Sequence, residues 1–181
     1  MTTHAIAHDR RITRLGVVGF AAALAAASQV AIPLPGTPVP LTLQPMLVVL
    51  AGMMLGPVPG AATMLIYLAA GAVGLPVFAP MGAPGVARLF GPTGGYLLAY
   101  PAAAYVAGLV MLRARSFRGR AMAAGAGILV LYLGGLAQLG VLTGSLTRAA
   151  LLGVVPFAMA DAVKALVAAA ITRSSAVAVT D

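Results

Sequence analysis

Long apolar stretches, interrupted by proline, glycine or arginine, run through almost the whole of this 181-residue chain. A transmembrane helix needs about 20 consecutive, mostly apolar residues. By this criterion of length, the apolar runs predict six membrane-spanning helices. Their expected ranges are 15–32, 43–56, 60–79, 93–112, 121–142 and 149–171. The second run is short for a full crossing, and the sequence GPVPG after it predicts a tight turn into the third run.

The composition excludes water as the main solvent of the folded chain. Hydrophobic residues make up 61% of the sequence and charged residues 8%, against roughly 25% charged residues in a soluble domain. We therefore expect an all-α membrane protein without a large soluble catalytic domain. The expected division is a cytoplasmic N-terminal tail at 1–14, a six-helix membrane domain at 15–172 and a cytoplasmic C-terminal tail at 173–181.

The arginines are distributed unequally between the two sides that six crossings define. Those at the chain ends and in the connection between the fourth and fifth runs are Arg10, Arg11, Arg14, Arg113, Arg115, Arg118, Arg120 and Arg173. Only Arg88 and Arg148 fall in the opposite loops. Under the positive-inside rule, this bias predicts cytoplasmic termini. The net charge of +8 is then a topology signal, so we expect no nucleic-acid partner.

The N-terminus allows a second interpretation. Arg10 and Arg11, followed by an apolar run that ends in AAASQ, resemble a cleavable secretory signal. Cleavage would leave five spans with the new N-terminus outside. The even number of spans and the arginine distribution favour an uncleaved first helix.

Small residues recur at four-residue spacing in the first apolar run, as at Ala22 and Ala26. Side chains of this size let another backbone approach the helix closely. This face either packs inside the protein or docks another membrane subunit, and the sequence leaves both interpretations open.

Two charged residues fall inside the last apolar run. Asp161 is the only acidic residue between Arg10 and Thr180, and Lys164 is the only lysine in the chain. Because they are three residues apart, they share one face of a helix. They either neutralise each other or point into a cavity and bind a polar ligand. In the second case the carboxylate accepts N–H groups, and the ammonium pairs with a carboxylate or carbonyl.

The two longer loops expected on the outer side carry further candidates. Arg88 lies in MGAPGVARLFGPTGG and either captures an anionic ligand or anchors the loop at the interface. Arg148 is interpreted as such an anchor. Prolines stiffen the loop PLPGTPVPLTLQ, whose Thr37, Thr42 and Gln44 either line a lid over an outward-facing pocket or belong to a plain rigid connection.

Aromatic residues near the ends of the runs can form apolar pocket walls or belong to the interfacial belt. They are Tyr67, Phe78, Phe90, Tyr96 and Tyr100. The chain has no cysteine, no phosphate-binding GxxxxGK motif and no combination of a nucleophile with a base. We therefore expect no catalytic site and no metal site, and we expect that the chain cannot power transport with ATP by itself.

Four segments resemble the BioY family, the biotin-specific substrate-binding (S) subunits of energy-coupling factor (ECF) transporters. They are VPLTLQP at 39–45, AAGAVGLPVFA at 69–79, LFGPTGGYLLAY at 89–100 and PFAMADAVKALVAA at 156–169. Together, in this order and spacing, the four segments cover essentially the whole chain. VPLTLQ and GPTGGYL are the segments most specific to the family. The resemblance implies the six-helix fold of ECF S components and an outward-facing biotin pocket that the first outer loop closes.

The resemblance also implies roles for individual residues. Asp161 and Lys164, in the D-x-x-K pattern of the last helix, are expected to bind biotin. Arg88 joins them, although GAPGVARL departs from the Gly-rich consensus of the family. The expected ligand-binding set also includes Thr42, Gln44 and Tyr67. Biotin suits these residues because it has an apolar ring and chain, a ureido group and one carboxylate.

The resemblance implies that the chain lies in a bacterial inner (plasma) membrane. The implied partners are a membrane-embedded coupling subunit and two cytoplasmic ATPases, besides biotin and membrane lipid. Ala22 and Ala26 look like the docking face for the coupling subunit. No cofactor is expected, because biotin is the transported ligand.

The sequence therefore favours a biotin-binding transport subunit over an enzyme. One alternative is a self-sufficient proton-coupled carrier for biotin or another small vitamin, in which Asp161 is the proton site. A second is an importer subunit for another vitamin or a metal ion, and a third is an intramembrane enzyme acting on lipid. A purely structural membrane protein would leave Asp161 and Lys164 dispensable.

Overall fold

The computed structural model describes residues 3–177 of the chain, and side chains within residues 13–172. The described residues form seven α-helices and one short 3-10 helix, without a strand. The helices are α1 (Thr3–Gln29), α2 (Gln44–Leu55), α3 (Pro57–Ala72), η1 (Gly85–Phe90), α4 (Gly94–Met111), α5 (Phe117–Thr143), α6 (Leu146–Gly153) and α7 (Ala158–Val177). Parts of the two predicted tails, residues 1–2 and 178–181, lie outside the described residues, and residues 3–14 form the first turns of α1.

The helix boundaries follow from capping residues and from glycine. Ser116 and Ser145 cap α5 and α6, because their hydroxyl oxygens accept hydrogen bonds from the backbone N–H groups of Gly119 and Arg148. Between α2 and α3, Gly56 has a φ of 89°, a conformation that favours glycine. The two short helices therefore follow each other directly, as the GPVPG sequence predicts.

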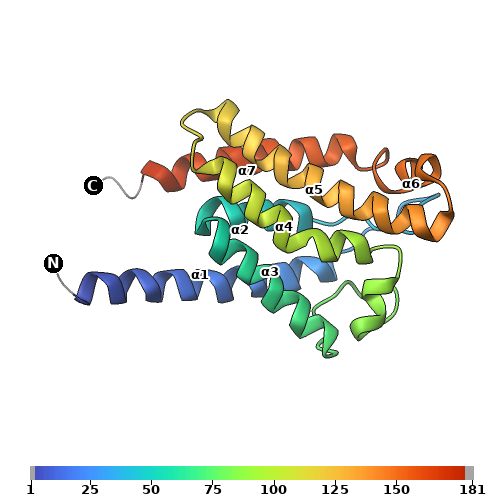
Figure 1. The fold of residues 1–181 in the computed structure, drawn as a ribbon, viewed down its shortest axis with the longest axis horizontal. Helices are drawn as coiled ribbons and strands as arrows, with labels where there is room; N and C mark the ends of the chain where they lie inside the picture. The colour runs from blue at the N-terminus through green and yellow to red at the C-terminus, as the bar shows by residue number, and fades with distance from the viewer. Residues whose placement is uncertain (1–2, 178–181) are drawn as a thin grey trace.

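The helices form one elongated bundle (Figure 1). In its centre, α4 packs against α5, α3 and α2, while α7 packs against α5 and α2. The N-terminal helix α1 lies along one edge of the bundle and contacts α2 and α3. These contacts bury an apolar interior that is continuous from α1 to α7.

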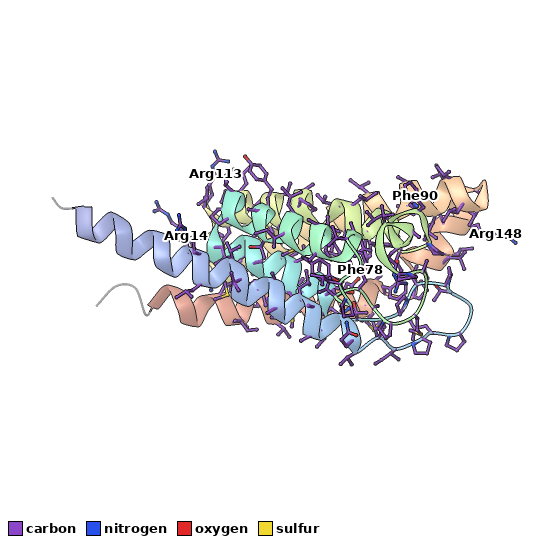
Figure 2. The ribbon with its side chains drawn as sticks, turned by 90° about the horizontal axis from the view of Figure 1, so that it is seen from below. Arg14, Phe78, Phe90, Arg113 and Arg148 are labelled. Atoms are coloured by element: carbon purple, nitrogen blue, oxygen red, sulfur yellow. The ribbon has the colours of Figure 1, made fainter. Side chains whose placement is uncertain are left out.

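The two ends of the bundle differ in what they carry. α1 begins and α7 ends at one end, here named the termini end; α6, η1 and the α1–α2 loop lie at the opposite end, here named the loop end (Figure 1). Arg14 and Arg113 lie towards the termini end and Arg148 at the loop end (Figure 2). This arrangement agrees with the expected arginine distribution, while the side of the membrane that each end faces stays a prediction.

Two described helices, α4 and α5, are long and apolar enough to cross a membrane by themselves. The pair α6 and α7, bent by 56° at its break, adds a third crossing if it is counted as one span. α2 and α3 are apolar but have only 12 and 16 residues. At about 1.5 Å per residue, α2 is shorter than a hydrocarbon core of ~30 Å. The all-helical architecture agrees with the prediction, whereas the count of six spans stays a prediction.

Two of the apolar runs are not helical over their whole predicted length. The run 60–79 continues past α3, which ends at Ala72 because Gly74 has a φ of 97° and Pro76 follows shortly after. The run 149–171 is divided into α6 and α7 by residues 154–157, which contain Pro156. Both interruptions leave non-helical backbone within an apolar run, and both contribute a phenylalanine to the cavity described next.

Candidate functional site

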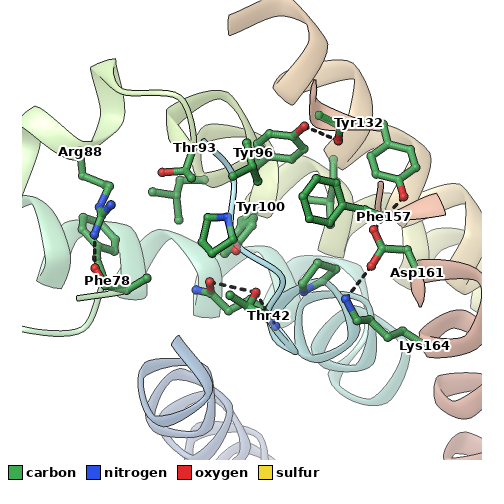
Figure 3. A pocket seen from close by; sticks show the side chains of 18 residues that line it. Thr42, Phe78, Arg88, Thr93, Tyr96, Tyr100, Tyr132, Phe157, Asp161 and Lys164 are labelled. Carbon is green, nitrogen blue, oxygen red and sulfur yellow. Dashed lines mark hydrogen bonds and ion pairs between the residues drawn. The ribbon is translucent and has the colours of Figure 1, made fainter. Parts of the chain in front are cut away.

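A pocket at the loop end of the bundle collects most of the candidate residues. It lies between the end of the α1–α2 loop, the segment at Phe78, α4, α5 and the start of α7 (Figure 3). Its empty space is about 690 Å³, open solvent at the mouth included. Its lining combines aromatic and aliphatic side chains with a few charged and polar groups, which is typical of sites for small organic ligands.

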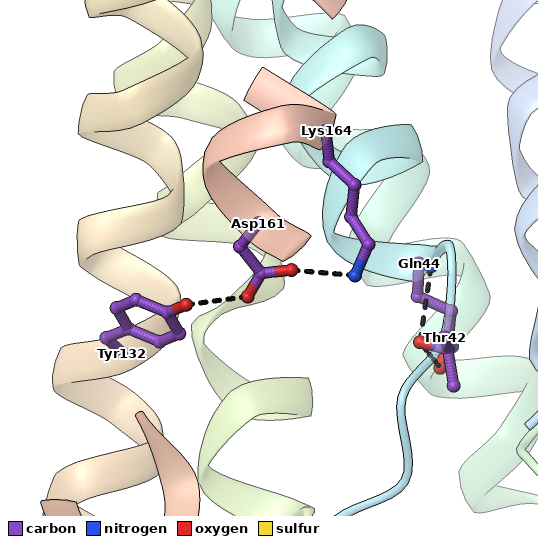
Figure 4. A network of polar contacts seen from close by, with 5 residues as sticks. All are labelled: Thr42, Gln44, Tyr132, Asp161 and Lys164. Carbon is purple, nitrogen blue, oxygen red and sulfur yellow. Dashed lines mark hydrogen bonds and ion pairs between the residues drawn. The ribbon is translucent and has the colours of Figure 1, made fainter. Parts of the chain in front are cut away.

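Asp161 and Lys164 form a buried ion pair in this pocket. Both lie in the first two turns of α7, and their side chains are joined by 2.7 Å between Lys164 Nζ and Asp161 Oδ1. The other carboxylate oxygen, Oδ2, accepts a hydrogen bond of 2.7 Å from the hydroxyl of Tyr132 on α5 (Figure 4). Asp161 is 4% and Lys164 8% exposed. The pair is thus fixed on one wall by two charge-assisted contacts and remains accessible to a ligand only from the pocket.

Arg88 lies on the opposite side of the pocket from the ion pair (Figure 3). The 3-10 helix η1 carries it, and only 7% of its surface is exposed. Its terminal nitrogens donate hydrogen bonds to the carbonyls of Ala79 and Met81, while its buried Nε has no partner in the described structure. Burial lowers the pKa of Arg88 from its ordinary value, and the nearby Tyr67 partly opposes this shift.

Arg88 and Lys164 give the pocket an unbalanced charge. Asp161 is the only acidic residue among positions 13–172, so one carboxylate faces two cations at the pocket surface. Arg88 forms no ion pair within that part of the chain. A buried charge without a counter-ion is unfavourable, so the pocket favours a ligand that brings one negative charge.

Thr42 and Gln44 line the pocket at the end of the first loop, whereas Tyr67 does not. Gln44 donates a hydrogen bond of 2.9 Å to the hydroxyl of Tyr67, which donates one of 2.8 Å to the carbonyl of Val77. Thr42 donates to Gln44 Oε1 at 3.3 Å. Tyr67 is 2% exposed and lies behind the pocket surface. It holds Gln44 and the segment at Val77 in place.

Hydrogen bonds hold the α1–α2 loop, the first loop of the chain, in place beside the pocket. Ile32 and Leu41 exchange two backbone hydrogen bonds, of 2.9 and 2.8 Å. Thr37, one of the expected lid residues, donates a hydrogen bond of 2.6 Å to the carbonyl of Leu152 at the end of α6. Pro40 of this loop faces the pocket. The loop therefore forms part of the wall and is tied to a second element.

Aromatic side chains supply most of the apolar wall. Phe78, Tyr96 and Tyr100 line the pocket, in agreement with one of the two interpretations of the sequence. Phe90 is 73% exposed and lies outside the pocket. Tyr96 is fixed by a hydrogen bond of 2.6 Å to the carbonyl of Gly153.

Tyr132 and Phe157 also line the pocket, and the sequence did not single them out. Tyr132 lies within a long apolar run without any local motif, and its contact to Asp161 bridges 29 positions of the chain. Phe157 lies beside Pro156 at the break before α7. A tyrosine hydroxyl inside an apolar run was the available signal, because such a hydroxyl needs a polar partner when buried.

Ala22 and Ala26 lie outside the pocket, on the exposed face of α1. On the opposite face of the same helix, Leu24 and Ser28 are fully buried. These two alanines are therefore not buried within the chain, and docking of another subunit on them stays a prediction. Within the described residues, no group of three His, Cys, Asp or Glu side chains is placed to hold a metal ion.

Comparisons with known proteins agree along nearly the whole chain. The sequence profile of the BioY family matches residues 3–181. A Pyrococcus horikoshii protein named probable biotin transporter BioY is 44% identical over 136 residues, or 75% of this chain and 80% of its own. The biotin transporter BioY of Thermotoga maritima is 36% identical over 162 residues, or 90% of this chain and 93% of its own.

A solved structure is similar over the same extent. The crystal structure of the S-component for biotin from an ECF-type ABC transporter superposes with a TM-score of 0.82 and 25% identity. The superposition covers 96% of this chain and 93% of the other.

Proposed function

The chain belongs to the BioY family, and from this premise we propose that it is the biotin-binding S subunit of an ECF-type importer. The family resemblance and the all-α membrane fold of an S component, both predicted from the sequence, are confirmed. The chain is a transport protein and not an enzyme. The transported ligand is biotin, whose binding to this chain is supported by the names of its relatives and by the pocket.

The single observation that supports biotin most strongly is the charge of the pocket. Two cations and one carboxylate line it, among aromatic and aliphatic walls. Biotin brings one carboxylate, an apolar ring and chain, and a ureido group with two N–H donors and one acceptor. A small apolar vitamin with one negative charge therefore satisfies both the charge and the wall chemistry.

The separation of the charged groups gives the ligand a direction. Asp161 accepts the ureido N–H groups and Lys164 donates to the ureido oxygen, because these two side chains already lie 2.7 Å apart on one wall. The biotin carboxylate points towards Arg88 on the opposite side, whose positive charge has no counter-ion among the described side chains (Figure 3). Thr42 and Gln44 contact the ligand from the first loop, and Tyr67 supports Gln44 from behind.

The pocket opens outward, and the termini lie in the cytoplasm. The arginines at the termini end support this orientation under the positive-inside rule. A coupling subunit docks on the exposed small-residue face of α1 at Ala22 and Ala26, and two cytoplasmic ATPases drive transport. Replacing both alanines by leucine is expected to abolish copurification with the coupling subunit while biotin affinity changes less than about twofold. Unchanged copurification would contradict this docking face.

Proton-coupled transport remains the second candidate, because Asp161 is a buried acid in an apolar helix. Its pairing with Lys164 favours a binding role over proton transfer, since the carboxylate already has a cationic partner within the same helix. Uptake that follows ATP hydrolysis and resists a protonophore supports the S-subunit proposal. Uptake by the chain alone that collapses with the proton gradient supports the carrier.

Equilibrium binding to the detergent-purified chain tests the proposed ligand. Radiolabelled biotin is expected to bind tightly, and thiamine and riboflavin are expected not to compete. Competition by either vitamin at equal concentration would refute biotin specificity. Absence of biotin binding to a folded, monodisperse sample would refute the proposal that the isolated chain forms the site.

A further inference from the structure

The segment 76–81 between α3 and η1 is held almost entirely by side chains. It belongs to no helix or strand, so its backbone carbonyls lack the usual partners. Side-chain donors nevertheless reach the carbonyls of Pro76, Val77, Phe78, Ala79 and Met81. Two of these residues, Phe78 and Ala79, line the pocket. We name this segment the pocket strap.

Two of the donors come from the last turn of α1. Ser28 is fully buried, and its hydroxyl lies 2.6 Å from the carbonyl of Val77 and 2.7 Å from that of Ala25 in its own helix. The adjacent Gln29 places Nε2 3.2 Å from the carbonyls of both Pro76 and Phe78. The same nitrogen lies 2.8 Å from the Ser28 hydroxyl oxygen and 3.3 Å from the carbonyl of Ala25, so its two hydrogens are shared among these acceptors. Neither side chain lines the pocket.

The strap has little freedom to find other partners. Behind it, the ring of Phe78 packs edge-on against Tyr67 at a centroid distance of 5.5 Å. On α3, a Cβ at Gly71 would collide with the Phe78 ring, so the ring occupies the space that this glycine leaves open. A strap without its polar donors would expose unpaired carbonyls near the membrane, which is unfavourable. It would then shift, and Phe78 would shift with it.

We propose that Ser28 and Gln29 are positioning residues, which hold the Phe78–Ala79 wall in its binding shape through hydrogen bonds to the strap carbonyls. The proposal rests on the biotin-binding function proposed above. It makes α1 a helix with two roles, because its exposed face carries Ala22 and Ala26 while its last turn shapes the pocket. Gln29 thus contributes to biotin affinity without touching biotin.

Substitution of Gln29 provides the test, since its side chain is exposed and its replacement is compatible with folding. Gln29→Met keeps a similar volume and removes the N–H donors, and biotin is expected to bind about tenfold more weakly. Gln29→Arg restores N–H donors at a similar reach and is expected to bind within about threefold of wild type. Equal weakening in both variants would overturn the proposal.

A double-mutant cycle separates positioning from a general structural effect. In the Phe78→Leu background, Gln29→Met is expected to change biotin affinity by less than about twofold, because both substitutions act on the same wall. Independent, multiplicative effects would overturn the proposal.

Ser28→Ala gives a second route, with Thr63→Val as its control. Thr63 is equally buried, but its hydroxyl bonds to Pro59 within its own helix at 2.8 Å. We expect Ser28→Ala to weaken biotin binding and Thr63→Val to leave it unchanged. Wild-type affinity in both Ser28→Ala and Gln29→Met would reject the positioning role while leaving biotin binding intact. Failure of the wild-type chain to bind biotin would instead reject the function on which the proposal rests.

Discussion

The loop end and the termini end of the bundle are built from different side chains. At the loop end, aromatic and polar residues such as Tyr96, Tyr132 and Phe157 surround a cavity. Towards the termini end, the buried positions include many alanines: Ala107, Ala123, Ala124, Ala165 and Ala168. Small side chains bring backbones into contact there. The same bundle is hollow at one end and closely packed at the other.

Glycines show how closely the helix backbones approach one another towards the termini end. A Cβ added to Gly52 on α2 would overlap the backbone carbonyl of Ala104 on α4. One at Gly108 would lie 2.7 Å from the carbonyl oxygen of Gly52, and one at Gly127 would lie 3.0 Å from that of Ala103. The backbones of α2, α4 and α5 therefore lie close together in this half of the bundle.

The largest effect is expected from the ion pair at the loop end. Asp161→Asn removes the charged acceptor that we assign to the ureido group, and biotin is expected to bind about 100-fold more weakly. Thermal stability is also expected to fall, because Lys164 keeps a buried charge without its partner. Binding assays and thermal unfolding measure the two effects separately.

The double variant Asp161→Asn/Lys164→Met distinguishes a binding pair from a merely neutralising one. Stability is expected to recover, since a buried ion pair can be replaced by uncharged residues at little cost. Biotin binding is expected to remain lost. Recovery of binding together with stability would show that the pair has no direct role in holding the ligand.

The next effect concerns the packed half. Gly52→Ala places a methyl group against the backbone of α4, which cannot rotate away, and is expected to lower stability by about 2 kcal/mol. The fraction that stays folded should bind biotin with wild-type affinity. Gly125→Ala is the matched control on α5, because a Cβ there meets no atom within 4 Å. Equal stability of the two variants would contradict the close packing.

A smaller effect is expected from the contact that orients Asp161. Tyr132→Phe removes one hydrogen bond of 2.7 Å to the carboxylate and keeps the ring in the pocket wall. Biotin is expected to bind about tenfold more weakly, since a hydrogen bond to a charged group contributes ~1.5 kcal/mol or more. Tyr105→Phe, on the exposed side of α4, should leave affinity unchanged. Equal affinity of both variants would remove Tyr132 from the site.

The sequence predicted Asp161 and Lys164 as candidates because charges inside apolar runs are rare and therefore conspicuous, and it predicted Arg88 as a candidate in a loop expected on the outer side. Asp161, Lys164 and Arg88 all line the cavity. The sequence also predicted the α2–α3 turn from the two prolines of GPVPG, and the structure shows that Gly56 adopts a positive φ there. It did not reveal the breaks after α3 and before α7, since an apolar run shows where a chain is buried but not where its helix stops.

The remaining site residues depend on contacts across helices. Tyr132 became visible only through its distance to Asp161, and Gln29 through carbonyls 47 and 49 positions away. Tyr67 was expected to contact the ligand, whereas the structure places its side chain behind the pocket surface, where it bonds to Gln44. A single sequence gives the spacing of residues along one helix, but not which neighbouring segment that helix faces.

A neutral analogue of biotin tests whether the unbalanced positive charge of the pocket recognises the ligand. The measurement compares the affinities of biotin and of neutral biotinamide for wild type, Arg88→Met and Arg148→Met. Arg148 is exposed and does not line the pocket, so its variant controls for the loss of one positive charge. Because Arg88 also holds the strap, the ratio of the two affinities isolates its charge from any change in pocket shape. We predict that wild type and Arg148→Met prefer biotin by at least about tenfold and that Arg88→Met prefers it by less than about threefold. Equal affinity of wild type for biotin and biotinamide would show that the positive charge of the pocket does not recognise the ligand carboxylate.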